Sequence, residues 1–477
     1  MQASPLSLFQ ILIFSMLTLL AGWLRPRWRA YFVLTGSLLA VYWIQPATPV
    51  RHLDFWFPTA SIFITILVWA TTCQNNLPNV RLALKQAIPI IAIVVLVGLT
   101  RYLGTVCCLT ATRPPEITQV IAASLLVTII LAIILARFNR SYTALLVLVL
   151  LIAVFICLKT ESLAKLASAA LRRLQGQDML LASPLDLRWL GFSYLAFRLL
   201  HVLRDFQLGK VQGASLGEFT SYALFFPALT AGPIDRSQRF ISDLRSETRM
   251  SPEILLDGGQ RILLGIFKKF VLADSLAIMA LSPQNAVQTA PGVWAWVLLY
   301  AYSLRIYFDF AGYTDIALGM GRWLGIKLPE NFTAPYFKTN LTAFWNSWHI
   351  TLAQWFRSYF FNPLTRALRT GRISLPVWLI ILAGQIGTML LIGLWHGVTW
   401  NFAAWGLWHA LGLFVHNRWS DWTRPRMSSL EGYPTMRHLA NLGGWFLTFN
   451  YVTLGWVWFA LPDIGLSLAM FQKLFSF

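Results

Sequence analysis

The stretch SLPVWLIILAGQIGTMLLIGLW, Ser374 to Trp395, contains no charged residue over its whole length. A helix needs about 20 apolar residues to cross the hydrocarbon of a bilayer, so this stretch is long enough to span one. His396 follows at once, between Trp395 and Gly397. Ionisable groups in apolar segments are costly and mark functional sites by default. The stretch therefore predicts a transmembrane helix that ends at a functional site.

The same character extends over the 477-residue chain, which is 57% hydrophobic and only 12% charged, with a mean hydropathy of +0.60. A soluble globular protein is closer to a quarter charged. The apolar residues come in long blocks separated by short basic loops. We therefore predict an all-α, polytopic integral membrane protein with about 11–13 transmembrane or re-entrant helices.

The formal net charge of +19 does not indicate a nucleic-acid-binding protein, because Lys and Arg lie in loops and at helix ends rather than in a basic stripe interleaved with aromatics. It is typical of the positive-inside rule. The loops after the first, third and fifth predicted spans are the basic ones. This bias predicts a multi-pass protein of the plasma or inner membrane with its N-terminus outside. The basic residues are Arg25, Arg27, Arg29, Arg81, Lys85, Arg137 and Arg140.

Six candidate spans occupy the first third of the chain, and a different segment follows them. The spans cover approximately residues 7–24, 31–46, 55–72, 84–104, 117–135 and 142–158. The stretch ESLAKLASAALRR, Glu161 to Arg173, keeps one apolar helical face. It predicts a helix along the membrane surface.

Beyond this stretch the predicted spans are shorter and are broken by Gly and Pro, as in FFPALTAGPIDRSQRF, Phe225 to Phe240. Irregular backbone at membrane depth is tolerated only where protein or a water-filled cavity satisfies it. The sequence therefore predicts one integral domain in three parts. These are N-terminal helices in 1–180, a core with the cavity in 181–420, and a C-terminal helix and tail in 421–477.

Three clusters of polar residues stand in this predicted core. Asp235 and Arg236 follow a Gly-Pro break, where they could bind substrate or cap a helix. Arg305 and Asp309 lie one helical turn apart, so they could line the cavity or form a buried ion pair without chemistry. The third cluster carries Asn346, His349, Gln354 and Arg357.

His349 and His396 are the candidate bases, because each ring can accept a proton near neutral pH and lies in Trp-rich apolar sequence. His409 and His416, seven residues apart on one helix face, are expected to be packing histidines. Two histidines without a nearby carboxylate or cysteine make a poor zinc site, so we predict no metal. The chain contains no H-E-x-x-H or P-loop motif. A base without a protein nucleophile predicts direct transfer between two bound substrates.

Five ordered motifs run from about Leu190 to Leu413: LGFSYLAFRLLHVLRD, FFPALTAGPIDRSQRF, YFDFAGYTDIALGMGRWLGIKLPENF, FWNSWHITLAQWFRSYFFNPL and GLWHGVTWNFAAWGLWHALGL. Together they resemble the bacterial branch of the membrane-bound O-acyltransferases. Within that branch, GPIDR, FKKFVLAD and GVTWNFAAWGLWHALGLFVHNRW look most like the D-alanyl transfer proteins of the Dlt system. The alginate O-acetyltransferase type is the next most similar, but it usually has Gly-Gly after its IPL element, where this chain reads NPLTRALRT.

The resemblance implies helices around a tunnel through the bilayer. His396 matches the family's essential histidine in G-x-W-H-G and is expected to remove the proton of an acceptor hydroxyl. His349 matches the second histidine in F-W-x-x-W-H. With Asn346, it is expected to orient the acyl group or to donate a hydrogen bond to the developing oxyanion. Arg357 and the basic residues near Arg236 are expected to attract either the phosphate of a phosphopantetheine arm or the acidic surface of a carrier protein.

The remaining candidate substrate-binding residues are three polar residues of the predicted core, Asp309, Arg305 and Asp235, together with Trp395 beside His396. The resemblance also implies the partners. No tightly bound cofactor is expected, because the donor is the phosphopantetheine thioester of an acyl carrier protein on the cytoplasmic side. The acceptor is a hydroxyl of a cell-envelope polymer such as teichoic acid, and a small membrane or extracellular partner protein is a further expectation.

Two other functions stay open at this point. An O-acetyltransferase of an exopolysaccharide would move a group that lacks the amino group of D-alanyl, so an acidic residue in the tunnel would favour D-alanyl transfer. A lipid or glycan transporter would use the same polar residues without making a bond. The sequence shows no paired inverted halves, and its histidines crowd into the last third, which counts against a transporter.

Overall fold

The computed structural model describes residues 6–72, 80–104, 107–137, 139–210, 213–371, 374–428 and 433–476. Every regular element in these ranges is a helix, so the predicted all-α class is confirmed. The chain forms two compact units. Of the described residues, we call those in 6–263 and 315–328 the N-terminal unit, and those in 264–314 and 329–476 the C-terminal unit. The predicted division at residues 180 and 420 stays a prediction.

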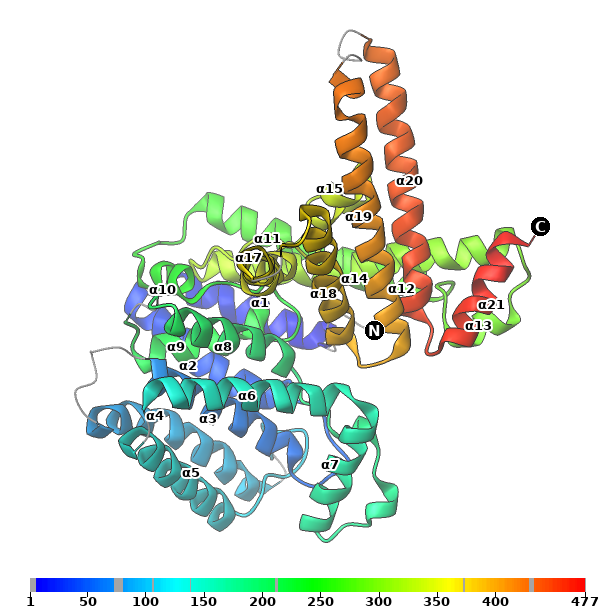
Figure 1. The fold of residues 1–477 in the computed structure, drawn as a ribbon. Coiled ribbons are helices and arrows are strands. Elements are labelled where there is room, and N and C mark those ends of the chain that lie inside the picture. The colour runs from blue at the N-terminus through cyan, green and yellow to red at the C-terminus, as the bar shows by residue number, and fades with distance from the viewer. Residues whose placement is uncertain are drawn as a thin grey trace. The chain divides into compact units, whose positions relative to one another are not determined.

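The N-terminal unit contains a helix at each of the six predicted spans and shorter helices after them (Figure 1). The spans are α1 (Leu8–Gly22), α2 (Pro26–Trp43), α3 (Leu53–Thr72), α4 (Val80–Leu99), α5 (Ile117–Arg137) and α6 (Arg140–Lys159). The following helices are α7 (Glu161–Leu174), α8 (Phe192–Gln207), α9 (Leu216–Ala223), α10 (Ser237–Arg245) and α11 (Pro252–Ile266). Short 3-10 helices are η1 (Thr100–Tyr102), η3 (Met179–Leu181), η4 (Pro184–Asp186) and η5 (Phe226–Ala228).

Helix α2 begins five residues before the predicted span, so Arg29 lies in the helix and not in the loop before it. Pro26 occupies the first helical turn, where its fixed φ and missing N–H are well tolerated. Arg29 therefore lies inside the helix and is buried, with only 2% of its surface exposed. Its guanidinium donates to the backbone oxygens of Thr248 (2.6 Å) and Ser246 (3.3 Å). Arg29 thus lies inside α2 and not in the loop where the sequence placed it, and the side of the membrane that it faces stays a prediction.

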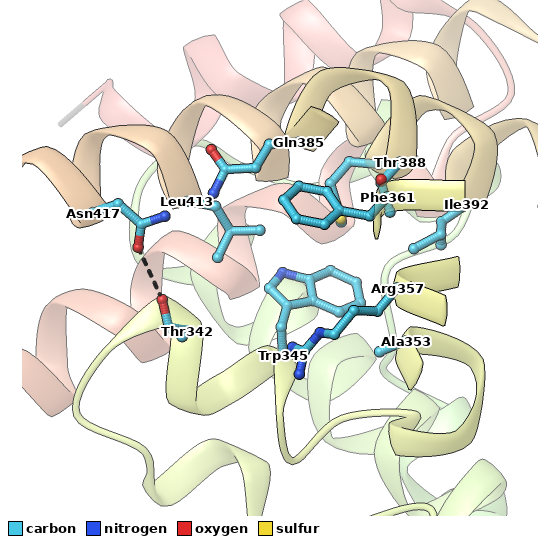
Figure 2. Close-up of a pocket in the computed structure, with 11 residues that line it drawn as sticks. Thr342, Trp345, Ala353, Arg357, Phe361, Gln385, Thr388, Ile392, Leu413 and Asn417 are labelled. Carbon is cyan, nitrogen blue, oxygen red and sulfur yellow. Dashed lines mark hydrogen bonds between the residues drawn. The ribbon is translucent and has the colours of Figure 1, made fainter. Parts of the chain in front are cut away.

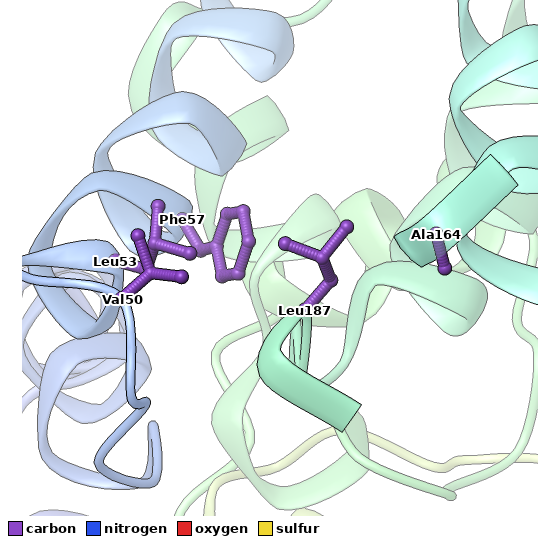
Figure 3. Packing of buried hydrophobic residues seen from close by; sticks show 5 residues of the cluster. All are labelled: Val50, Leu53, Phe57, Ala164 and Leu187. Atoms are coloured by element: carbon purple, nitrogen blue, oxygen red, sulfur yellow. The ribbon is translucent and has the colours of Figure 1, made fainter. Parts of the chain in front are cut away.

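A small apolar core joins α3 to the segment around α7 in the N-terminal unit (Figure 3). The ring of Phe57 stacks on Trp189 with centroids 4.7 Å apart, and Trp189 Nε1 donates to Ser61 Oγ at 2.9 Å. Such a stack adds to the free energy gained by burying both rings. The buried members of the cluster are Val50, Leu53, Phe57, Ala164 and Leu187.

The C-terminal unit carries the histidine motifs on a set of shorter and longer helices (Figure 1). Before residue 335 they are the π-helix η6 (Phe267–Ala273), α12 (Asp274–Ala277), α13 (Pro283–Gln288) and α14 (Val293–Trp323), which belongs to this unit as far as Thr314. Next come η7 (Pro335–Phe337), α15 (Leu341–Trp345), α16 (Ile350–Phe356), the π-helix η8 (Arg357–Phe361) and α17 (Asn362–Thr370). The last four are α18 (Val377–His396), α19 (Trp400–Ser428), α20 (Pro434–Ala460) and α21 (Ile464–Phe475). Helices α19 and α20 run side by side as a long pair.

Four helices in the described parts of the chain are long and apolar enough to cross a membrane: α3, α5 over Ile117–Ile134, α6 and α18. The apolar windows of α5 and α6 are only 17% and 22% buried, whereas that of α3 is 78% buried. A large exposed apolar surface is costly in water, so α5 and α6 are suited to contact lipid. The expected total of 11–13 crossings and the expected surface position of α7 stay predictions.

A buried ion pair holds α7 to the turn before α8, outside the membrane-spanning helices. The carboxylate of Asp186 accepts from Arg172 Nε at 2.9 Å and from Ser168 Oγ at 2.6 Å. Burial by itself raises the pKa of a carboxyl, but these hydrogen bonds outweigh it and hold the pKa of Asp186 below its ordinary value. The ion pair therefore stabilises the folded protein at neutral pH.

Replacement of this carboxylate should destabilise the N-terminal unit. Asp186→Ala leaves the Arg172 guanidinium buried without its partner, which costs about 3–5 kcal/mol and lowers the thermal unfolding midpoint in detergent. Glu161→Ala, at the exposed start of α7, is the matched control and should change little. The difference between wild type and Asp186→Ala should shrink as the pH falls below about 4, where the carboxyl becomes protonated. Equal midpoints at pH 7 would contradict this account.

Candidate active site

Helices α18 and α19 cross so closely that the contact requires two glycines. A Cβ on Gly393 would collide with the backbone oxygen of Phe402, and one on Gly406 would lie 2.6 Å from the backbone oxygen of Met389. Small residues at a helix crossing allow the two backbones to approach. Gly393 lies one turn before the end of α18, so this crossing fixes where His396 stands.

A short turn separates His396, the last residue of α18, from Trp400, the first residue of α19. Thr399 Oγ1 accepts from the backbone N–H of Phe402 at 3.3 Å, which satisfies one of the free donors at the start of α19. The turn confirms the prediction of a helix that ends at His396. The histidine follows the apolar segment because the chain reverses there and enters the next helix.

The imidazole of His396 is half-buried among aromatic rings. The ring of Phe459 from α20 lies edge-on with centroids 4.6 Å apart, and Trp395 lies at 4.5 Å. Phe402 and Trp405 from α19 both lie at 5.8 Å. Three helices therefore supply the walls around this histidine.

His349 occupies a strained position at the start of α16. Its backbone has φ 42° and ψ 52°, which is the left-handed region. For a residue with a Cβ this conformation costs about 1–2 kcal/mol and persists only when the surroundings hold it. Two backbone hydrogen bonds hold the segment here, from Ile350 N to Asn331 O at 3.0 Å and from Thr333 N to Ser347 O at 3.1 Å. The loop that begins at Asn331 thus ties down the chain on both sides of His349.

The side chain of His349 is buried, with 4% of the residue exposed. Its Nδ1 lies 3.3 Å from Asn331 Oδ1. Its Nε2 is buried and has no hydrogen-bond partner among the described residues. The ring packs edge-on against Phe310 of α14 with centroids 4.7 Å apart.

His349 and His396 line the same cavity, which has a volume of about 40 Å³. This volume is large enough for one or a few waters or for the reacting atoms of a substrate, but not for a whole acyl donor. The ring of Trp395 packs against both histidines, at 4.5 Å from His396 and 6.1 Å from His349. Apart from the two histidines the lining is apolar or aromatic: Ile306, Phe310, Trp345, Trp348, Leu352, Ile392, Trp405, Trp456 and Phe459.

A larger cavity of about 220 Å³ shares Trp345 and Ile392 with the histidine cavity. Figure 2 shows the indole of Trp345 among the lining residues, with Phe361 on one side of it and Arg357 on the other. Arg357 Nη2 donates to the amide oxygen of Asn346 at 2.7 Å. The other lining residues are Thr342, Ala353, Gln385, Thr388, Met389, Leu413 and Asn417.

The structure brings some of the predicted site residues together at these cavities. His396, His349 and Trp395 meet at the small cavity, and Arg357 lines the large one. Asn346 is exposed and holds Arg357. It does not line either cavity.

Asp309 forms a buried ion pair with Lys269 of the π-helix η6. The suggested ion pair between Asp309 and Arg305, one turn back on α14, is therefore wrong. Neither residue lines the two cavities, although Ile306 and Phe310 beside them do. The ion pair anchors the part of α14 that supplies two walls of the histidine cavity.

Asp235 and Arg236 belong to the N-terminal unit, where they precede α10. Asp235 accepts from the backbone N–H of Arg236 at 2.7 Å and from Arg239 Nε at 2.8 Å. Its backbone oxygen accepts from Tyr222 at 3.0 Å. Arg236 is the N-cap residue of α10 and makes no capping hydrogen bond with its side chain. Asp235 therefore forms an ion pair with Arg239 beside the start of α10 and makes no recorded cap of the helix, and a role in substrate binding stays a prediction.

Sequence reasoning passed over several residues that build this site. Asn331 lies in the quoted motif LPENF but was given no role, although its side chain is fully buried beside His349. Trp456 and Phe459 come from α20, a region with weaker motif similarity. The predicted packing role of His409 is confirmed, because its ring lies buried against Trp345 and Trp405 at 5.2 and 4.9 Å.

The described residues contain no group of three His, Cys, Asp or Glu side chains that could hold a metal ion. The two cavities also contain no carboxylate. What the arrangement offers is a pair of imidazoles in a largely aromatic pocket. Such a pair can accept or deliver a proton.

The sequence profile of the membrane-bound O-acyltransferase family matches residues 134–461. The chain is 33% identical over 285 residues to a teichoic acid D-alanyltransferase of Streptococcus thermophilus. The aligned region covers 57% of this chain and 68% of that protein. It is 32% identical over 289 residues to a probable alginate O-acetylase of Pseudomonas syringae pv. tomato, and the aligned region covers 60% of this chain and 52% of that protein. A peptidoglycan O-acetyltransferase of Helicobacter pylori is 34% identical to the chain over 263 residues, and the aligned region covers 54% of this chain and 47% of that protein.

The chain spans about two thirds of the length of the D-alanyltransferase and about half the length of the two acetyl-transferring relatives. A polytopic helical protein with two histidines at one enclosed cavity is the class that the fold and site define. The chain belongs to the membrane-bound O-acyltransferase family. It is therefore a multi-pass membrane acyltransferase.

The helix crossing at Gly393 should be essential for the site. Gly393→Ala inserts a methyl group against the backbone of α19, so the helices must separate, at a cost of about 1–3 kcal/mol. We expect a lower thermal midpoint and loss of acyl transfer. Gly443→Ala in α20 is the control, because a Cβ there meets no atom within 4 Å, and it should be neutral or slightly stabilising. Equal behaviour of the two variants would refute the close crossing.

Proposed function

We propose that this protein transfers a D-alanyl group from the thioester of an acyl carrier protein to a hydroxyl of a cell-envelope polymer such as teichoic acid. The observation that carries this proposal is the convergence of His349 and His396 on one cavity lined largely by aromatic residues. The adjoining larger cavity offers room for the end of the donor. The similarity to a teichoic acid D-alanyltransferase supports the choice of acyl group and acceptor.

His396 acts as the general base in this proposal. Its ring removes the proton from the acceptor hydroxyl as the oxygen attacks the thioester carbonyl. The tetrahedral intermediate then expels the thiolate, and the proton passes from His396 to the sulfur. The products are an ester and a free carrier thiol, with no covalent enzyme intermediate. General-base assistance of this kind contributes typically about 10²–10⁴-fold in rate.

The donor and acceptor reach the cavity from opposite sides of the bilayer in this proposal. The carrier protein presents its phosphopantetheine arm from the cytoplasm, and the polymer approaches from outside, where the N-terminus also lies. Arg357 stands at the larger cavity and is held by Asn346, so it can attract the phosphate of the arm. Asp235, Arg236, Arg305 and Asp309 hold structural positions in the two units and act on substrate only indirectly.

Acetyl transfer is the second candidate, and one observation favours it. A D-alanyl group carries an ammonium, yet neither cavity contains a carboxylate to bind it. Aromatic faces such as that of Trp345 are an alternative partner for an ammonium. The alginate and peptidoglycan acetyl-transferring relatives are as similar to the chain as the D-alanyltransferase is. The acyl group must therefore be identified chemically.

The ester content of the cell envelope tests the proposal. Acyl groups released by mild base are identified by mass in wild type, a deletion strain and His396→Ala at matched membrane abundance. We expect His396→Ala to match the deletion strain, and the missing acid to be D-alanine. His438→Ala is the control, because His438 is an exposed histidine of the same unit, and it should keep wild-type content. Loss of acetate instead supports the second candidate. Unchanged esters in folded His396→Ala would contradict the role of His396 as the general base.

The role of Arg357 can be tested with the carrier thioester itself. Arg357→Gln should raise the KM for the thioester several-fold and leave kcat nearly unchanged, because the guanidinium binds the donor away from the reacting atoms. Arg366→Gln, which removes an exposed arginine of α17, controls for general attraction of an acidic carrier. If both variants raise KM equally, Arg357 has no specific contact with the arm.

A further inference from the structure

Asn331 is a buried residue of the C-terminal unit to which the mechanism above gives no role. None of its surface is exposed. Its Oδ1 accepts from the backbone N–H of Thr351 at 3.2 Å and from Thr351 Oγ1 at 2.7 Å. The same oxygen lies 3.3 Å from Nδ1 of His349. One amide oxygen thus contacts both the start of α16 and the ring of His349.

The backbone N–H of Thr351 decides how the Asn331 amide is oriented. A backbone N–H can only donate, so the atom that faces it must be the amide oxygen and not the amide nitrogen. That oxygen can only accept. The 3.3 Å contact with His349 therefore requires a proton on Nδ1.

The position of this proton determines what the other ring nitrogen can do. In a neutral imidazole one nitrogen donates and the other accepts. With the proton on Nδ1, the Nε2 atom of His349 carries the lone pair. Nε2 is the buried atom without a hydrogen-bond partner in the described chain, on a ring that lines the small cavity. It can accept a hydrogen bond there, but a neutral ring cannot donate one from it.

We propose that Asn331 is a positioning residue that fixes His349 in the Nδ1–H tautomer and so makes Nε2 a hydrogen-bond acceptor for an O–H or N–H group of a substrate. This inference rests on the proposed acyl transfer for its functional meaning. It decides between the two roles expected for His349: the residue orients a substrate, and it does not donate to the oxyanion. A second residue that orients a histidine in this way typically affects activity about 10–100-fold.

The surroundings of His349 leave Asn331 as the residue that sets its tautomer. The elements packed around the cavity contribute Phe310 from α14, Trp345 and Trp348 beside α15, Ile392 from α18, and aromatic side chains from α19 and α20. His396 is the other titratable group that lines the cavity. Asp309, next to Phe310 on α14, is engaged in its ion pair with Lys269.

A simpler role for Asn331 is to cap α16 through Thr351, and the variants must separate the two roles. Asn331→Leu removes the acceptor oxygen at similar volume. Asn331→Asp keeps an acceptor oxygen at the same reach and replaces the Nδ2 donor, which has no partner among the described residues, with a second oxygen of an ionisable carboxyl. Thr351→Val removes one hydrogen bond of the cap and leaves the contact with His349 intact.

The tautomer is measured directly on purified protein labelled with ¹⁵N-histidine, in lipid or detergent at a pH where the ring is neutral. The two ring nitrogens differ in ¹⁵N shift according to which one carries the proton, and His349→Gln assigns the signals. We expect Nδ1–H in wild type, Asn331→Asp and Thr351→Val, and a loss of that preference in Asn331→Leu. An Nε2–H tautomer in wild type overturns the proposal. This readout needs no substrate, so it is independent of whether acyl transfer is the correct function.

Acyl transfer then tests whether the tautomer matters. Asn331→Leu should lower kcat roughly 10–100-fold, and Asn331→Asp should restore most of it. In a His349→Gln background Asn331→Leu should have no further effect, because it acts through the missing ring. A full additional loss in that background shows a structural role only and overturns the proposal. If wild type transfers no acyl group at all, the proposed function fails while the tautomer result stands.

Titrations of the two substrates identify the group that Nε2 accepts. If it is the hydroxyl of the polymer, Asn331→Leu raises the KM for the polymer. If it is an N–H of the donor, such as the ammonium of D-alanyl, the KM for the thioester rises instead. Either result supports an acceptor nitrogen at the site, whereas unchanged KM and kcat for both substrates contradict it.

Discussion

The close backbone contact between α18 and α19 is the constraint on which the candidate site depends. With no room for a Cβ at Gly393 or Gly406, the two helices meet along their main chains just before the turn at Gly397. This contact decides where the last residue of α18 lies, and it brings the aromatic residues of α19 beside it. The reactive ring of His396 is thus held by packing of rigid helices rather than by a flexible loop. Helix-borne catalytic groups of this kind are positioned more accurately than loop-borne ones.

The chemistry that we propose depends on the largely aromatic lining of the cavity. Aromatic rings form most of its walls, so electrostatic interactions and hydrogen bonds inside it are stronger than in water. Unpaired polar atoms are correspondingly expensive in such a place. The protein nevertheless buries His349 with a free Nε2 on a left-handed backbone. Both features cost stability, and both are accounted for if a substrate completes the hydrogen bond during turnover.

The sequence allowed much of the fold and part of the site to be predicted, and the reason differs from residue to residue. The six spans of the first third could be predicted because the length of an apolar stretch can be seen in the sequence without knowing which segments pack together. His396 and His349 are found because they stand in motifs. The partner of Asp309 could not be predicted because Lys269 comes from a different helix, 40 residues earlier in the chain. Asn331 was passed over because its contact with His349 links a loop to a helix start 18 residues later.

The central claim is that His396 and His349 serve one reaction in one cavity, and a double-variant cycle tests it most directly. Rates of acyl transfer from a purified carrier thioester would be compared for His396→Ala, His349→Gln and the double variant in the same lipid. Residues that act on the same bound substrate lose activity in a strongly non-additive way. The account predicts that the double variant is no slower than the slower single variant. Losses that multiply would mean that the two histidines act at separate sites, and they would contradict the account.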